Sequence, residues 1–314
     1  MTTIATLRSL RTSCGVLCGL LVASIAQADP TVETLRATND SHPVVITYYP
    51  VKEQTNSSSR ENAPVVVLLH GSDKGRILWD KAAPGRGEKA NFAQSLNDDG
   101  YAVITVDLRK FGDSKQPGDV SSLRPDDWEK MASGDLFAVK QFILEKHQSK
   151  QFNMNKMAII AAGPTAPVAI NFAAADWTMP PHDDAPVEAN KTPRGQDVRA
   201  LVLLSPESSA GRLNANRALN VIKQPALGVA MLVVVGAQDS ADKSQAKKIF
   251  ELMEKAQRKD EKRVYMVTPP LKDRELGLIG KAPDQVEVVI RNFLNKHVKE
   301  FPSAWRDRKN KVTG

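Results

Sequence analysis

The sequence contains little cysteine and few aromatic residues. Only two cysteines occur among 314 residues, Cys14 and Cys18, and aromatic side chains make up 5%. Because the chain beyond Cys18 contains no cysteine, that part can form neither a disulfide framework nor a cysteine-based zinc site. The shortage of aromatic residues argues against stacking platforms for single-stranded nucleic acid. The chain has 43 basic and 36 acidic residues, with no long run of one charge, so we expect no nucleic acid partner.

The first 28 residues have the pattern of a secretory signal peptide. Two arginines precede an apolar run from Cys14 to Ala26, and this run leads into a small-x-small cleavage site that ends at Ala28. The apolar run is too short to span a membrane as a helix. We therefore expect export to the periplasm or the cell exterior. The mature chain would then lack both cysteines and any membrane anchor.

The remaining chain alternates apolar runs with helical patterns, at an ordinary globular composition of 41% hydrophobic and 25% charged residues. The runs predict strands at Thr31–Ala37, Val44–Tyr49, Val65–Leu69, Tyr101–Leu108, Met157–Ala162, Leu201–Leu204, Met231–Val235 and Val264–Val267. The predicted helices are Lys89–Leu96, Pro125–Lys150, Ala166–Ala175, Ala241–Arg258 and Pro283–Phe301. Such alternation predicts a mostly parallel sheet with helices on both faces. No repeat or long linker divides residues 29–301, so we expect one domain, followed by a basic tail at 302–314.

Several short motifs, in chain order, resemble those of the α/β-hydrolase family. Residues 70–71 end a buried strand like the family's oxyanion loop, and residues 100–114 are similar to the next strand and its loop. Residues 236–239 resemble the acid-bearing turn, and 289–294 the closing helix. The resemblance runs from about residue 31 to 301 and implies the family's central sheet, without a large lid domain. It also implies that the strand at Met157–Ala162 lies centrally, between those at 65–69 and 201–204.

The catalytic residues that this resemblance implies are mostly absent. The family needs a serine in a G-x-S-x-G elbow, a histidine base and a carboxylate, and no G-x-S-x-G occurs in the chain. The nucleophile position falls on Gly163, and the following Pro164 lacks the N–H that would line the oxyanion hole. The loop at 268–280, where the histidine belongs, has none, and Lys272 lies within it. Only Asp239 remains, at the position of the triad acid.

Three hydroxyl groups near the expected pocket are candidates for a relocated nucleophile. Ser72 follows His70 and Gly71, Thr165 follows the elbow, and Ser205 ends a predicted strand. We expect Thr165 to cap the helix that follows and both serines to make hydrogen bonds within turns. His70 is expected to pack against the loop that it opens.

No residue pattern predicts a metal ion or a cofactor. His182 precedes two aspartates but lacks a second, suitably spaced histidine, so a solvated loop is the simpler interpretation. Asp239 has a simpler role too, as a cap for the helix predicted from Ala241.

Two hypotheses about function follow. The missing nucleophile, oxyanion donor and base favour an exported, non-catalytic protein that binds a small molecule or another protein. The alternative is an esterase-like or peptidase-like hydrolase with a relocated nucleophile. Fold alone does not choose between these hypotheses, because function depends on the residues of the site.

The predicted signal peptide at residues 1–28 leads to a direct prediction about the N-terminus of the mature protein. Mass spectrometry of the exported form should find an N-terminus at or near Asp29, because cleavage follows the small-x-small site. Recovery of the full-length chain from a membrane fraction would contradict this prediction.

Overall fold

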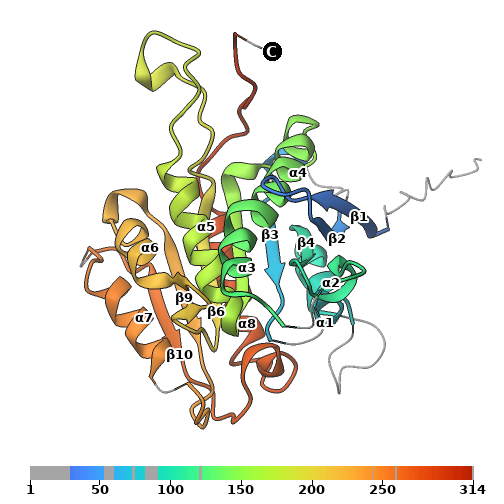
Figure 1. Cartoon of the computed structure of the whole chain (residues 1–314). Helices are drawn as coiled ribbons and strands as arrows, with labels where there is room; N and C mark the ends of the chain where they lie inside the picture. Colours follow the sequence, from blue (N-terminus) through green and yellow to red (C-terminus); the bar gives the residue numbers. More distant parts are fainter. Residues whose placement is uncertain are drawn as a thin grey trace, which may run out of the picture.

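An eight-stranded sheet forms the middle layer of the structure, a computed structural model (Figure 1). The described residues are 29–52, 60–72, 75–81, 91–119, 122–242, 244–258 and 260–312. The predicted signal peptide at 1–28 lies outside them. Among the described helices, none has the length and apolar character needed to cross a membrane.

The strands follow the order β1-β2-β4-β3-β5-β6-β9-β10 across the sheet. Their bounds are β1 Thr31–Arg36, β2 Pro43–Tyr49, β3 Val65–Leu69, β4 Ala102–Asp107, β5 Met157–Ala162, β6 Val198–Leu204, β9 Ala230–Val234 and β10 Val264–Val267. β2 pairs antiparallel with both β1 and β4, and the other neighbours pair in parallel. The predicted mostly parallel sheet is confirmed, and β5 lies between β3 and β6 as expected.

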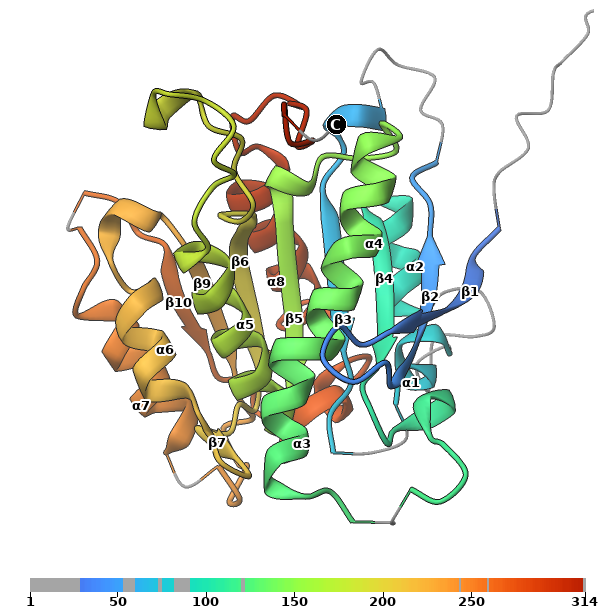
Figure 2. The same cartoon turned by 45° about the horizontal axis from the view of Figure 1, so that its top comes forward.

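Helices cover both faces of the sheet (Figure 2). The bounds are α1 Ile77–Asp80, α2 Phe92–Asp98, α3 Pro125–Lys130, α4 Leu136–Gln148, α5 Ala166–Thr178, α6 Ala215–Ile222, α7 Gln245–Glu254 and α8 Glu287–Leu294. Alternate residues of a strand point to opposite faces. Val65 and Val67 therefore pack in the cluster that α3 to α7 cover, while Val66 packs in the cluster of α1, α2 and α8. Burial on both faces explains why these strands read as continuous apolar runs.

Some element boundaries differ from the predictions. The helix expected from Ala241 begins at Gln245, because Ser244 has a φ of 65°, a left-handed conformation outside the helical range. The last helix begins at Glu287 rather than at Pro283. Helices α1 and α6 and the small hairpin of β7 (Ser209–Ala210) and β8 (Leu213–Asn214) were not predicted.

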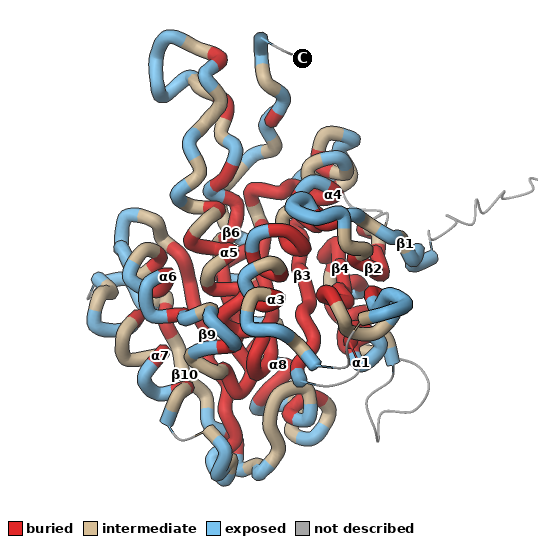
Figure 3. The backbone as a smooth tube through the Cα atoms, in the orientation of Figure 1, coloured by how far each residue is buried: buried red, intermediate tan, exposed pale blue. Residues whose placement is uncertain are grey.

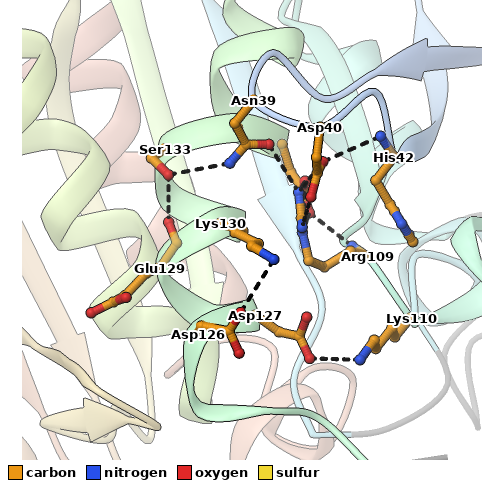
Figure 4. A network of polar contacts seen from close by, with 12 residues as sticks. Asn39, Asp40, His42, Arg109, Lys110, Asp126, Asp127, Glu129, Lys130 and Ser133 are labelled. Carbon is orange, nitrogen blue, oxygen red and sulfur yellow. Dashed lines mark hydrogen bonds and ion pairs between the residues drawn. The ribbon is translucent and has the colours of Figure 1, made fainter. Parts of the chain in front are cut away.

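The predicted helix Pro125–Lys150 is divided by a π-helical turn at Met131–Asp135, whose last residue binds Arg109. Asp135 is fully buried. Its carboxylate accepts a hydrogen bond from the backbone N of Arg109 at 2.9 Å and another from Arg109 Nη2 at 2.6 Å. The same guanidinium reaches Asp40, with 2.7 Å between Arg109 Nη1 and Asp40 Oδ2 (Figure 4). Arg109 thus ties the β1–β2 turn to the end of β4 and to the π turn. A buried cation is stable only when it is paired in this way.

The predicted basic tail packs against the domain over its described residues. Trp305 donates from Nε1 to the carbonyl of His147 at 2.9 Å, and the two rings lie 5.1 Å apart. Arg308 is 3% exposed and forms an ion pair with Asp197, at 2.8 Å between Nη1 and Oδ1. Figure 3 shows one buried point along a segment that is otherwise exposed or half-buried, and this point is Arg308.

Arg308 belongs to a buried cluster of two cations and two carboxylates. Lys140 of α4 contacts Asp176 of α5 and lies 3.1 Å from Asp197 Oδ2, so the charges balance. Removing one cation would leave a carboxylate buried without full compensation. That situation typically costs 3–5 kcal/mol.

We therefore predict that Arg308→Ala lowers the free energy of unfolding by about 3–5 kcal/mol in urea denaturation. Arg306→Ala is the matched control, because that side chain is exposed, and it should change stability by less than about 0.5 kcal/mol. Equal effects of the two substitutions would show that the cluster does not hold the C-terminal segment.

Candidate functional site

The candidate site lies where the carboxyl ends of the parallel strands meet, at the lower edge of the sheet in Figure 1. Ser72 follows β3, Gly163 follows β5, and Ser205 follows β6. Asp239 follows β9, and the loop at 268–280 follows β10. The topology brings the predicted positions to one edge, although they are far apart in the sequence.

Gly163 forms the turn between β5 and α5. Its φ is 53°, in the left-handed region that glycine adopts without steric cost. Its carbonyl accepts a hydrogen bond from the backbone N of Glu207 at 3.1 Å, and Pro164 begins the next turn without an N–H to offer. The backbone has the shape of the elbow, but Gly163 has no side chain and Pro164 has no N–H.

The carboxylate of Glu275 fills the space beside this elbow. A Cβ atom added to Gly163 would lie only 2.6 Å from Glu275 Cδ, closer than real Cβ contacts come. A Cβ on Gly71 would overlap the same carboxylate. Glu275 itself has a φ of 53°, and its backbone N donates to Ser205 Oγ at 3.1 Å. Two glycines on neighbouring strands thus leave room for one acidic side chain.

Ser72 holds both oxygens of the Glu275 carboxylate. Its backbone N donates to Oε2 at 2.7 Å, and its hydroxyl donates to Oε1 at 2.8 Å. We expected Ser72 to bond within its own turn, so this partner from the far loop is a correction. The charged acceptor explains the preference, because hydrogen bonds to a carboxylate are stronger than those to neutral groups.

Arg274 occupies the place beside Asp239 where the family resemblance expects histidine. Its Nε lies 3.6 Å from Asp239 Oδ2 and 4.0 Å from Glu275 Oε1, and its Nη2 lies 3.9 Å from Glu207 Oε1. Burial raises the pKa of Glu207, and the negative charge of Glu275 adds to this shift, while Arg274 opposes it. Asp239 also accepts from the backbone N of Ala241 at 3.0 Å, within a turn that precedes α7.

Lys272, which the sequence indicated as the degenerate histidine position, is exposed to solvent. Backbone hydrogen bonds explain why Arg274 faces the acid turn instead. Leu271 accepts from the N of Gln238 at 3.0 Å, and Pro269 accepts from the N of Ala237 at 2.8 Å. These bonds hold residues 269–271 along the acid turn, and the chain then passes Asp239 at Arg274.

The other sequence candidates are buried and fully engaged. Thr165 Oγ1 lies 2.8 Å from the carbonyl of His70 and accepts from the N of Ala162 at 3.1 Å, so it joins the ends of β3 and β5. The prediction that its side chain caps α5 is wrong, because it makes no cap hydrogen bond. Ser205 is 1% exposed, and its hydroxyl is bound by the distant Glu275 rather than within its own turn as expected. Of the three candidate nucleophiles, only Ser72 is exposed.

His70 packs as expected against the loop that it opens. Its Nδ1 lies 2.7 Å from the carbonyl of Gly71, and its ring centre lies 4.2 Å from that of Phe111. Burial lowers the pKa of His70, so the neutral ring is favoured near neutral pH. Among the described residues, no group of three or more histidine, aspartate or glutamate side chains could hold a metal ion.

Several solved structures with a similar arrangement are hydrolases. Dienelactone hydrolase from Anabaena variabilis is 14% identical, with a TM-score of 0.55 over 87% of this chain and 99% of its own. An esterase from Pyrococcus furiosus is 13% identical, with a TM-score of 0.56 over 86% and 91%. The chain has the α/β-hydrolase fold.

An acylaminoacyl peptidase from Pyrococcus horikoshii shares the fold as well, at 12% identity and a TM-score of 0.58, over 88% of this chain and 43% of the peptidase. No protein-family model matches the sequence, and no curated protein matches it. Similarity at this level establishes the fold alone. In this α/β-hydrolase fold, Gly163 occupies the elbow. The sequence did not predict that Arg274 faces Asp239 or that Glu275 lies beside Gly163.

A double-mutant cycle tests the packing of Glu275 on Gly163. Gly163→Ala should lower the free energy of unfolding by at least about 1–3 kcal/mol, because a β-carbon strains the positive φ and also overlaps the carboxylate. In a Glu275→Ala background only the strain remains, so the cost should fall by about 0.5–3 kcal/mol. Urea denaturation of the four proteins measures both terms.

Gly118→Ala is the matched control, because Gly118 has a φ of 90° and a Cβ there would meet nothing within 4 Å. Its cost should be the same with and without Glu275. An equal cost of Gly163→Ala in both backgrounds would contradict the observed packing.

Proposed function

We propose that this protein is an exported, non-catalytic α/β-hydrolase-fold protein that binds a small molecule or another protein. One observation carries the proposal. The Glu275 carboxylate lies where the side chain of a nucleophile would have to project from the elbow. A substrate carbonyl at the elbow would therefore meet a negative charge rather than a hydroxyl group.

Each step of serine hydrolysis lacks its residue at this site. Gly163 offers no hydroxyl for attack, and Pro164 offers no N–H to the oxyanion, a loss that typically costs about 3–4 kcal/mol of transition-state stabilisation. Arg274 stands beside the acid, but a guanidinium stays protonated and cannot accept a proton. Because catalytic residues act as a unit, Asp239 alone retains little function.

The export part of the proposal is supported by the sequence pattern of residues 1–28 and by the absence of cysteine beyond Cys18. A chain of this length can bury a core large enough to fold without disulfides.

One contact favours a second candidate, a hydrolase with a relocated nucleophile. The exposed Ser72 hydroxyl donates to Glu275 Oε1 at 2.8 Å, so the carboxylate is placed to accept its proton as Oγ attacks an ester carbonyl. This candidate lacks an identified oxyanion donor and an imidazole for the leaving group, so it ranks second.

Hydrolysis of p-nitrophenyl acetate separates the two candidates. We predict that wild type, Gly163→Ser and Ser72→Ala all hydrolyse the ester at the buffer rate. Restoring one hydroxyl at the elbow leaves the base and the oxyanion donor absent. Wild-type turnover that Ser72→Ala abolishes would overturn the proposal in favour of the relocated site.

A combined variant tests where the missing base belongs. Gly163→Ser, Pro164→Met and Glu275→Ala should gain more activity with Arg274→His than with Lys272→His, because Arg274 faces Asp239 and Lys272 is exposed. A greater gain with histidine at 272 would contradict the assignment of Arg274.

A further inference from the structure

A cavity of about 250 Å³ lies at the opposite end of the sheet from the candidate site. Its walls come from α4, from the segment at 179–197 between α5 and β6, and from the C-terminal segment. These last two segments lie side by side at the top of Figure 1. The amino ends of the parallel strands meet here, so nothing in this cavity belongs to the hydrolase-like edge.

Two joined segments form the outer wall of the cavity. Asp184 accepts from the backbone N of Thr192 at 2.9 Å and from that of Lys311 at 3.1 Å. Arg308 Nη2 donates to the carbonyl of Gly195 at 3.0 Å. The segment at 179–197 and the C-terminal segment are therefore held together by specific contacts beside the cavity.

One side of the cavity is apolar. Phe137 and Leu144 of α4 line it together with Met154 and Met179. Flexible methionine side chains adapt to apolar ligands of different shape. The volume is just below the usual range for drug-sized ligands, about 300–1,000 Å³, so the occupant must be small.

The polar side of the cavity carries unneutralised positive charge. Lys140 and Arg308 line it, but Asp176 and Asp197 balance their charges. Arg194 also lines it, is exposed, and has no ion pair or hydrogen bond among the described residues. His182 adds a ring whose Nδ1 lies 3.4 Å from Asn310 Nδ2.

Arg308 has an unpaired N–H, which is a feature separate from the charge of Arg194. Its side chain is 3% exposed, and its Nε has no hydrogen-bond partner among the described residues. A buried N–H without a partner costs free energy. Both arginines thus line the same small cavity, Arg194 without an ion pair among the described residues and Arg308 with one unpaired N–H.

We propose that this cavity binds a small monocarboxylate with an apolar tail. The carboxylate interacts with Arg194 and Arg308, and the tail packs against Phe137, Leu144 and Met179. A single negative charge matches Arg194, the cavity cation that has no carboxylate partner among the described residues. This inference does not depend on whether the elbow is catalytic.

Isothermal titration calorimetry with octanoate as the probe tests the proposal on the mature chain. Octanoate should bind saturably at low salt, while octan-1-ol and octylammonium, which have tails of equal length, should bind at least about tenfold more weakly. A charge-assisted hydrogen bond accounts for a difference of this size. Equal binding of the three probes, or no saturable binding of octanoate, would overturn the proposal.

Variants locate the binding. Arg194→Gln should weaken octanoate binding about tenfold and leave octan-1-ol unchanged, and Met179→Trp should abolish binding by filling the cavity. Arg217→Gln, at an exposed arginine of α6, is the matched control and should bind octanoate like wild type. Because substitution of Arg308 is expected to destabilise the fold, the binding test uses Arg194→Gln. Unchanged octanoate affinity in Arg194→Gln, or in Met179→Trp, would place the binding elsewhere and refute the assignment.

Discussion

The carboxylate of Glu275 lies against two glycines, Gly71 and Gly163, that end neighbouring strands. A β-carbon at either position would overlap the carboxylate unless the Glu275 side chain moved. Ser72 fixes the carboxylate oxygens, and Ser205 accepts from the Glu275 backbone. The space at the carboxyl end of the sheet, beside the elbow, is thus filled by the Glu275 carboxylate. The elbow keeps its left-handed turn, yet the geometry that exposes a serine in a hydrolase here accommodates a neighbouring side chain.

The sheet was the most predictable part of the molecule from sequence. Each strand is an apolar run buried on both faces, and hydrophobic periodicity reports burial directly. Gly163 and Pro164 were found because they lie at the end of such a run, where the register can be counted. The π turn at Met131–Asp135 could not be found this way, because it depends on the buried contact between Asp135 and Arg109.

The site loop was the least predictable part. Residues 268–280 have no periodicity, so the sequence showed only that histidine was missing from them. Which residue faces Asp239 depends on backbone hydrogen bonds from Leu271 and Pro269 and on the positive φ at Glu275. The acidic and basic pair at 274–275 was visible in the sequence, but nothing local distinguished it from a solvated loop. The role of Arg308 was hidden for the same reason, because its partners lie more than a hundred residues away.

The two ends of the sheet therefore differ in what they can do. At the carboxyl end, the Glu275 carboxylate fills the elbow, and Arg274 lies within 4.0 Å of Glu275, Asp239 and Glu207. At the amino end, the segment at 179–197 and the C-terminal segment line a cavity, where Arg194 has no ion pair and the buried Arg308 Nε no hydrogen-bond partner among the described residues. This distribution of charge and space is the basis of our proposal that the protein binds a ligand without serine chemistry.

The most direct test of the central claim is intact-mass spectrometry after exposure to a serine-directed fluorophosphonate. An accessible, activated serine would add one phosphonyl group per chain, whichever serine it is. We predict an unchanged mass for the wild-type protein, because Gly163 has no hydroxyl and Ser72 has no imidazole base among the described residues. Stoichiometric labelling that Ser72→Ala removes would contradict it.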